Sequence, residues 1–232
     1  MEANLNTQKV GGEKPSLFGM ITSPGLQFER MKTTEKVWGM FFLVALLQGL
    51  VGGLTTYVVN TSPEIIKMQK ELGELAGKGS ITSEVISGIG SSFVGGMIGA
   101  LFVAAIYKVF MMFFGNDTSY KKLLMIVVYA NMVLIIGGLI NGVVAVILDG
   151  GATQYTSLGP LFKQGSLAYG IGNTIEIFYI WNLALTWLGL HITSGLSKVK
   201  VSIPIMVLFI IKVFFLATIT VLIAKLLPGM LI

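Results

Sequence analysis

Residues 123–148 read LLMIVVYANMVLIIGGLINGVVAVIL, a stretch without a single charged side chain. A helix needs roughly 20 consecutive apolar residues to cross the hydrocarbon core of a bilayer. Backbone groups in lipid must be hydrogen-bonded within their own segment, so such a stretch is expected to be helical. The segment therefore predicts one membrane-spanning helix and makes a membrane protein the first hypothesis.

Four further stretches pass the same test of length and apolarity. They are residues 37–59, 87–114, 169–190 and 201–227. Charges inside them are few: Lys108 lies in the first half of the chain, and Glu176, Lys212 and Lys225 lie in the second half. We predict an all-α membrane protein, a bundle of five transmembrane helices.

The composition excludes several classes of protein. Hydrophobic residues make up 54% of the chain and charged residues only 12%, which does not fit a soluble globular enzyme or a disordered chain. The chain has no cysteine and one histidine, so disulfides and thiolate metal sites are excluded, and no metal or cofactor is expected. The basic residues are scattered, which argues against binding of nucleic acid. Motifs of known catalytic sites are missing from the sequence, so we expect no enzyme.

The distribution of Lys and Arg predicts the orientation. If the amino terminus is cytoplasmic, the inner segments hold more than twice as many of these residues as the outer segments. The positive-inside rule therefore favours a multi-pass protein of the cell membrane, with a cytoplasmic amino terminus and an extracytoplasmic carboxyl terminus.

Two segments outside the spans are expected to be ordered. Residues 1–16 are polar and predicted to be a disordered cytoplasmic tail, and residues 17–227 form the membrane domain. Ser23-Pro24 is typical of a helix start, and we expect a short helix on the inner membrane surface, with a plain linker as the alternative.

The loop at residues 60–86 is predicted to contain an amphipathic extracytoplasmic helix that starts at Pro63. One face of this helix carries four apolar residues at spacings of three and four: Ile65, Met68, Leu72 and Leu75. The face is expected to rest on lipid, on the protein's own spans, or on a partner.

Charged residues within the spans are costly and mark candidate sites. Lys108 lies near the inner boundary, where its long side chain is expected to snorkel to the interface. Glu176 and Lys212 lie deeper in the fourth and fifth spans. They are expected to form an ion pair, or Glu176 is protonated beside a cavity while Lys212 binds a partner's carboxylate or a lipid phosphate. Asn182 is a candidate for hydrogen bonding between helices.

Three pairs of glycines have the GxxxG spacing that lets helices approach closely in lipid. They are Gly49 and Gly53, Gly95 and Gly99, and Gly138 and Gly142. These faces are expected to pack the bundle internally or to join a second subunit, which leaves a homo-oligomer open.

Several passages resemble the Yip domain, the family of Ypt/Rab-interacting integral membrane proteins and their bacterial relatives. They are Ser23-Pro24 with Phe28 and Trp38, then Tyr129-Ala130 with Gly137-Gly138, and finally Trp187-x-Gly189-Leu190 with Gly195-Leu196-Ser197. The resemblance implies five helices with a cytoplasmic amino terminus. The bacterial branch includes an accessory component of an ABC exporter, so the resemblance also implies a role in assembly without chemistry of its own.

Two functions follow as hypotheses. The first is a non-enzymatic accessory protein that helps to assemble a membrane transporter complex, an ABC exporter for toxin or peptide resistance. Its partners would be membrane lipids and an ABC permease, an ATPase or a membrane fusion protein. The second is a small channel or carrier that uses Glu176 and Lys212 within the membrane.

Overall fold

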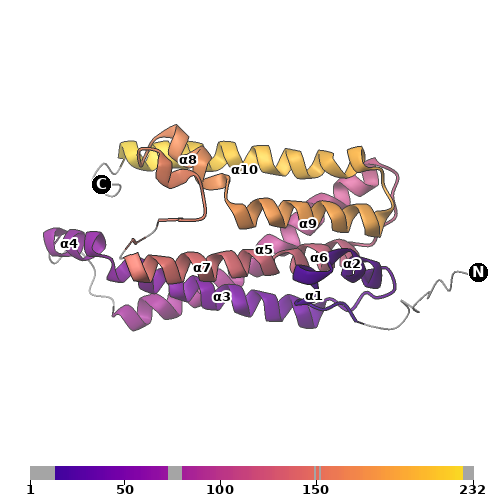
Figure 1. The fold of residues 1–232 in the computed structure, drawn as a ribbon, viewed down its shortest axis with the longest axis horizontal. Helices are drawn as coiled ribbons and strands as arrows, with labels where there is room; N and C mark the ends of the chain where they lie inside the picture. The colour runs from indigo at the N-terminus through magenta and orange to yellow at the C-terminus, as the bar shows by residue number, and fades with distance from the viewer. Residues whose placement is uncertain (1–13, 73–79, 149, 152, 227–232) are drawn as a thin grey trace, which may run out of the picture.

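The computed structural model describes residues 14–72, 80–148, 150–151 and 153–226 (Figure 1). The long helices are α3 (Trp38–Thr61), α5 (Ile81–Phe113), α6 (Tyr120–Ala130), α7 (Met132–Leu148), α9 (Ile177–Ser194) and α10 (Lys198–Leu226). The short ones are α1 (Gly19–Thr22), α2 (Pro24–Met31), α4 (Pro63–Leu72), α8 (Leu167–Thr174) and the 3-10 turn η2 (Gly159–Leu161). The prediction of an all-α protein is confirmed for these residues.

Four helical segments of the described chain are long and apolar enough to cross a membrane. They are α3, α5, α6 taken together with α7, and α10. Asn131 separates α6 from α7 but keeps a helical backbone, and its N–H donates to the carbonyl of Val127 at 3.0 Å, so the two act as one rod. These four segments match the predicted spans 37–59, 87–114, 123–148 and 201–227.

The predicted span at residues 169–190 is not one continuous helix. The structure divides it into α8 and α9, because Ile175 leaves the helical conformation and Glu176 is extended, with φ −114° and ψ 135°. At 1.5 Å per residue α9 is about 27 Å long, slightly less than the roughly 30 Å hydrocarbon core. A discontinuous pair of helices therefore stands where the fourth span was expected.

The helices lie side by side along the long axis of the molecule (Figure 1). α3 and α7 lie on one side with the first part of α5, and α9 and α10 lie on the other. α8 packs on the last third of α10, where Gly170 lies against Ala217 and Thr220. The first turn of α3 and the last turn of α10 lie at opposite ends of the bundle.

α6 forms the centre of the protein. Each of its residues from Leu123 to Ala130 is buried, and Leu123, Leu124, Met125 and Ile126 are fully buried. α5, α9, α3 and α2 all contact it. The apolar stretch that predicts the membrane class thus also supplies the core.

The predicted amino-terminal helix is present as α2 and packs on the bundle, and its position at the inner membrane surface stays a prediction. α2 is present from Pro24, but Phe28 and Met31 are fully buried, and Phe28 lies against Gly189 of α9 and Ile126 of α6. The bundle therefore covers Phe28 and Met31, whereas Leu26 of the same helix is 42% exposed. Of the predicted disordered tail, residues 14–16 are described, and the Tyr129 hydroxyl donates to the carbonyl of Pro15, whereas residues 1–13 lie outside the described part of the chain.

The predicted outer helix is present as α4, from Pro63 to Leu72. Ile65 is half-buried and Ile66 is 40% exposed. The side chains of Met68 and Leu72, and all of Leu75, lie outside the described residues. Which surface the apolar face rests on stays a prediction.

Two of the three glycine pairs lie in contacts between helices. A Cβ at Gly49 would stand 3.1 Å from the carbonyl oxygen of Ile89 in α5, and Gly53 lies against the Ile89 side chain. Gly138 and Gly142 lie against Val51 and Leu54 of α3. These glycines let α3 approach α5 and α7 closely.

The third pair is different. A Cβ at Gly95 or Gly99 of α5 would meet no atom of the described chain within 4 Å. Gly90 shares this freedom but lies five residues before Gly95, about 140° further around the helix at 100° per residue. The Gly95–Gly99 face is therefore not used to pack α5 within the described chain.

Replacement of Gly49 by leucine should destabilise the fold by about 1–3 kcal/mol, because the new side chain meets the backbone of α5 and cannot be accommodated without separating the helices. The matched variant Gly90→Leu should be neutral or slightly stabilising, since a leucine there has free space and a better helix propensity. Thermal unfolding of the purified protein in detergent measures both. Equal unfolding temperatures for the two variants would contradict the packing described here.

Candidate functional site

The break between α8 and α9 is built around Glu176. Its carboxylate caps α9, with Oε1 accepting the N–H of Phe178 at 3.0 Å and Oε2 accepting the N–H of Tyr179 at 2.6 Å. The negative charge also lies at the positive end of the α9 dipole. The charged residue is thus used to start a helix within the apolar part of the chain.

Backbone hydrogen bonds on the other side of the break come from the loop after α7. The N–H of Ile177 donates to the carbonyl of Thr156, and the N–H of Leu158 donates to the carbonyl of Ile175. Together they form the isolated antiparallel bridge at Ser157 and Glu176. The loop therefore folds back beside α9 and satisfies peptide groups that the break exposes.

A chain of polar side chains connects this break to α7. Asn141 Nδ2 donates to the hydroxyl of Thr156 at 2.6 Å, and that hydroxyl donates to Glu176 Oε1, also at 2.6 Å. Asn141 Oδ1 accepts the backbone N–H of Thr156 at 3.1 Å. Because a hydroxyl has one proton to donate, the Asn141 amide leaves it free to point at the carboxylate.

A cavity of about 410 Å³ lies beside this polar chain. Glu176 and Asn141 line it together with Thr55 of α3, the glycines Gly137 and Gly138 of α7, and other residues of α7 and the following loop. The predicted Glu176 thus faces a cavity, but each contact described for its carboxylate is one in which it accepts a hydrogen bond.

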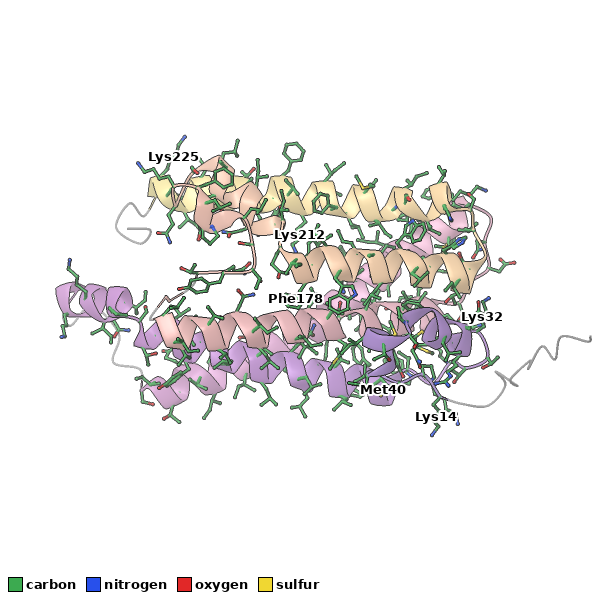
Figure 2. All side chains as sticks on the ribbon, viewed as in Figure 1. Lys14, Lys32, Met40, Phe178, Lys212 and Lys225 are labelled. Carbon is green, nitrogen blue, oxygen red and sulfur yellow. The ribbon has the colours of Figure 1, made fainter. Side chains whose placement is uncertain are left out.

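Lys212 lies at the midpoint of α10, about 21 Å from either end of the helix. Its ammonium nitrogen stands 3.1 Å from the centre of the Tyr179 ring, a cation–π contact. In Figure 2 Lys212 lies between α10 and α9, and Phe178 lies on the α7 side of α9, where it covers Gly137. Phe178 and Tyr179, two successive residues in the first turn of α9, therefore contact different helices: Phe178 contacts α7, and Tyr179 contacts α10.

No ion pair joins Glu176 and Lys212 in the described part of the chain. The two groups have separate partners, but Tyr179 links them, because its N–H binds Glu176 and its ring lies under Lys212. The structure thus brings both predicted residues to the start of α9. Thr156 and Tyr179, which the sequence did not single out, complete the arrangement, and no local pattern marks either of them.

Lys212 also lines a second cavity, of about 400 Å³, bordered by α5, α6, α7, α9 and α10. The buried Asn182 faces it, and Asn182 Nδ2 donates to Asn131 Oδ1 at 3.2 Å. This bond joins α9 to the turn between α6 and α7, which is the kind of contact predicted for Asn182.

Lys108 lies apart from both cavities, in the last turns of α5. Its ammonium donates to the carbonyl of Thr118 at 3.0 Å, beyond the end of the helix. The side chain therefore extends toward the end of the bundle, the direction that snorkelling requires. No group of three or more acidic or histidine side chains gathers as a metal site among the residues that the structure describes.

An all-helical bundle with four long apolar helices and charges held within it defines an integral membrane protein. The sequence of the Yip1 domain matches residues 18–221, and the chain belongs to this family. A relative that shares 36% identity over 221 residues is "Membrane protein YknW" of Bacillus subtilis (strain 168), with 93% of this chain and 94% of the relative covered. No solved structure matches the chain.

Substitution of Thr156 by valine should destabilise the protein by about 1–3 kcal/mol, since it leaves the Glu176 carboxylate and the Asn141 amide each short of a partner. Thr55→Val is a matched control, because the Thr55 hydroxyl donates only to a carbonyl of its own helix, that of Val51. Thermal unfolding in detergent should show a clear loss for Thr156→Val and little change for Thr55→Val. If the two variants unfold alike, the polar chain does not hold the break.

Proposed function

We propose that this protein is a non-enzymatic accessory subunit of a membrane transporter complex, an ABC exporter, and that it acts by binding neighbouring membrane helices. Its partners would be the permease, the ATPase or a membrane fusion protein. Membership of the Yip1 family and similarity to YknW support a membrane accessory role. That the complex is an ABC exporter is the part of the proposal that goes beyond this similarity.

The observation that carries this proposal is the outward surface of α5. Large apolar side chains lie exposed on it, including Phe102 at 65% and Phe113 at 81%. Gly95 lies among them, and nothing in the described chain comes near it. Lipid alone places no demand for a small residue there, whereas a second helix needs one for close approach.

The carrier hypothesis has less support from the geometry. The Glu176 carboxylate accepts two N–H groups of α9 and the Thr156 hydroxyl, so it already has a structural task. A carboxylate that binds and releases a substrate or a proton would have to give up these bonds, which would uncap α9. We therefore favour the accessory role.

We further infer that the chain crosses the membrane five times, with α8 and α9 together as the fourth crossing. α8 packs beside the last third of α10, and α9 continues to the opposite end of the bundle (Figure 1). Non-helical backbone within a membrane is tolerated where other parts of the protein surround it. Here the backbone of residues 156–158 pairs with the break between α8 and α9. The amino terminus would be cytoplasmic and the carboxyl terminus extracytoplasmic.

Labelling of single cysteines tests this topology, because the natural chain has none. In intact cells a membrane-impermeant maleimide should label Ser80→Cys and Lys163→Cys, and should reach Thr33→Cys and Ser197→Cys only after permeabilisation. All four side chains are exposed in the structure. Labelling of Ser197→Cys in intact cells would show that α8 and α9 do not form a crossing.

Co-purification tests the accessory role. The tagged full chain, extracted from its native membrane in mild detergent, should bring down an ABC permease or ATPase. Gly95→Leu should lower the recovery about tenfold, since an overpacked contact costs 1–3 kcal/mol, while Gly90→Leu on the other side of α5 should leave it unchanged. Recovery of the wild-type chain alone would refute the proposal, and recovery of a differently tagged copy alone would indicate a homo-oligomer.

A further inference from the structure

The cavity around Lys212 combines a polar wall with apolar ones. α9 supplies Tyr179, Asn182 and Thr186, whose spacing of three and four residues places them on one face of the helix. α5 supplies Ala100 and Val103, and α10 supplies apolar residues on both sides of Lys212. Asn182 and Thr186 are buried, so the polar wall lies deep in the bundle.

The same cavity reaches the outer surface of the bundle. Its lining includes Ile211 and Phe215 of α10, which are 58% and 61% exposed, and the exposed Gly99 of α5. A Cβ atom at Gly99 would have no neighbouring atom of the described chain within 4 Å. Because these residues lie halfway along long apolar helices, the opening faces the hydrocarbon core of the bilayer.

Lys212 is a charge at the bottom of this opening. No carboxylate lies within 4.0 Å of its ammonium group in the described residues, although Glu176 is near enough to interact with it electrostatically, and the Tyr179 ring covers one side of it. A charge at this depth is costly, and charges within spans usually mark a ligand or a partner. The other sides of the ammonium group are free to donate hydrogen bonds to an anion.

We propose that this cavity binds a long-chain carboxylic acid from the bilayer, with its carboxylate on Lys212 and its chain between α5 and α10. A volume of about 400 Å³ falls within the range of sites for small molecules. A carboxylic acid can enter hydrocarbon in its protonated, neutral form, whereas a phosphodiester stays charged. Gly99 lies at the opening of this cavity and also on the Gly95–Gly99 face, so Lys212, which lies on α10, is the residue that tests the cavity separately from partner binding.

Photolabelling of the purified full chain in phosphatidylcholine nanodiscs tests the proposal. The probes are a diazirine analogue of hexadecanoic acid and the matching diazirine hexadecanol. The acid should label peptides of α5, α9 and α10, unlabelled hexadecanoic acid should compete, and the alcohol should label about tenfold less, since it lacks the charged partner.

Variants separate the charge from the shape of the site. Lys212→Met should reduce labelling by the acid about tenfold or more, while Lys212→Arg should retain most of it. Removal of a charge from the middle of a span is not expected to impair insertion. Gly99→Leu should block the cavity from the α5 side, and Lys225→Met, on the exposed end of α10, should label like the wild type.

Several outcomes would overturn the assignment. Equal labelling by the acid and the alcohol, or unchanged labelling of Lys212→Met, would mean that the cavity is only a groove for lipid chains. Competition by phosphatidylglycerol without competition by hexadecanoic acid would mean that the anion is a lipid phosphate. Either result leaves the co-purification experiment above unaffected, so the two proposals fail separately.

Discussion

Peptide groups that leave a helix inside a bilayer must find partners within the protein, since each unsatisfied group costs several kcal/mol. The break between α8 and α9 meets this constraint with two elements. The Glu176 carboxylate accepts N–H groups at the start of α9, and the backbone at Thr156 and Leu158 pairs with Ile177 and Ile175. The loop after α7 folds back beside α9 to supply these partners.

The two deep charges are accommodated in different ways at the same end of α9. The Glu176 carboxylate accepts three hydrogen bonds, two from its own helix and one from Thr156, so its charge serves the fold. Lys212 has an aromatic face on one side and a cavity on another. A structural role therefore accounts for Glu176, whereas Lys212 can still bind a ligand. Tyr179 connects them, and the capped first turn of α9 sets where its ring lies.

The glycines show how one sequence pattern serves two surfaces. Gly49, Gly53, Gly138 and Gly142 bring α3 against α5 and α7. Gly95 has the same spacing to Gly99 but faces away from the described chain. The internal pairs build the bundle around which the break is arranged, and the outward pair leaves α5 able to approach another helix.

The sequence by itself determined the membrane class, the all-α fold, four of the expected spans, and the charged residues Glu176 and Lys212 that line the two cavities. Hydropathy and charge are properties of contiguous residues, so a window of the chain is enough to read them. The tertiary structure alone decided where residues 169–190 break, since Asn141 and Thr156 are distant in sequence and hydropathy stays high across Glu176. It also decided that Phe28 packs in the bundle and that Gly95 does not, because the partner of a helix face depends on which other helices come beside it.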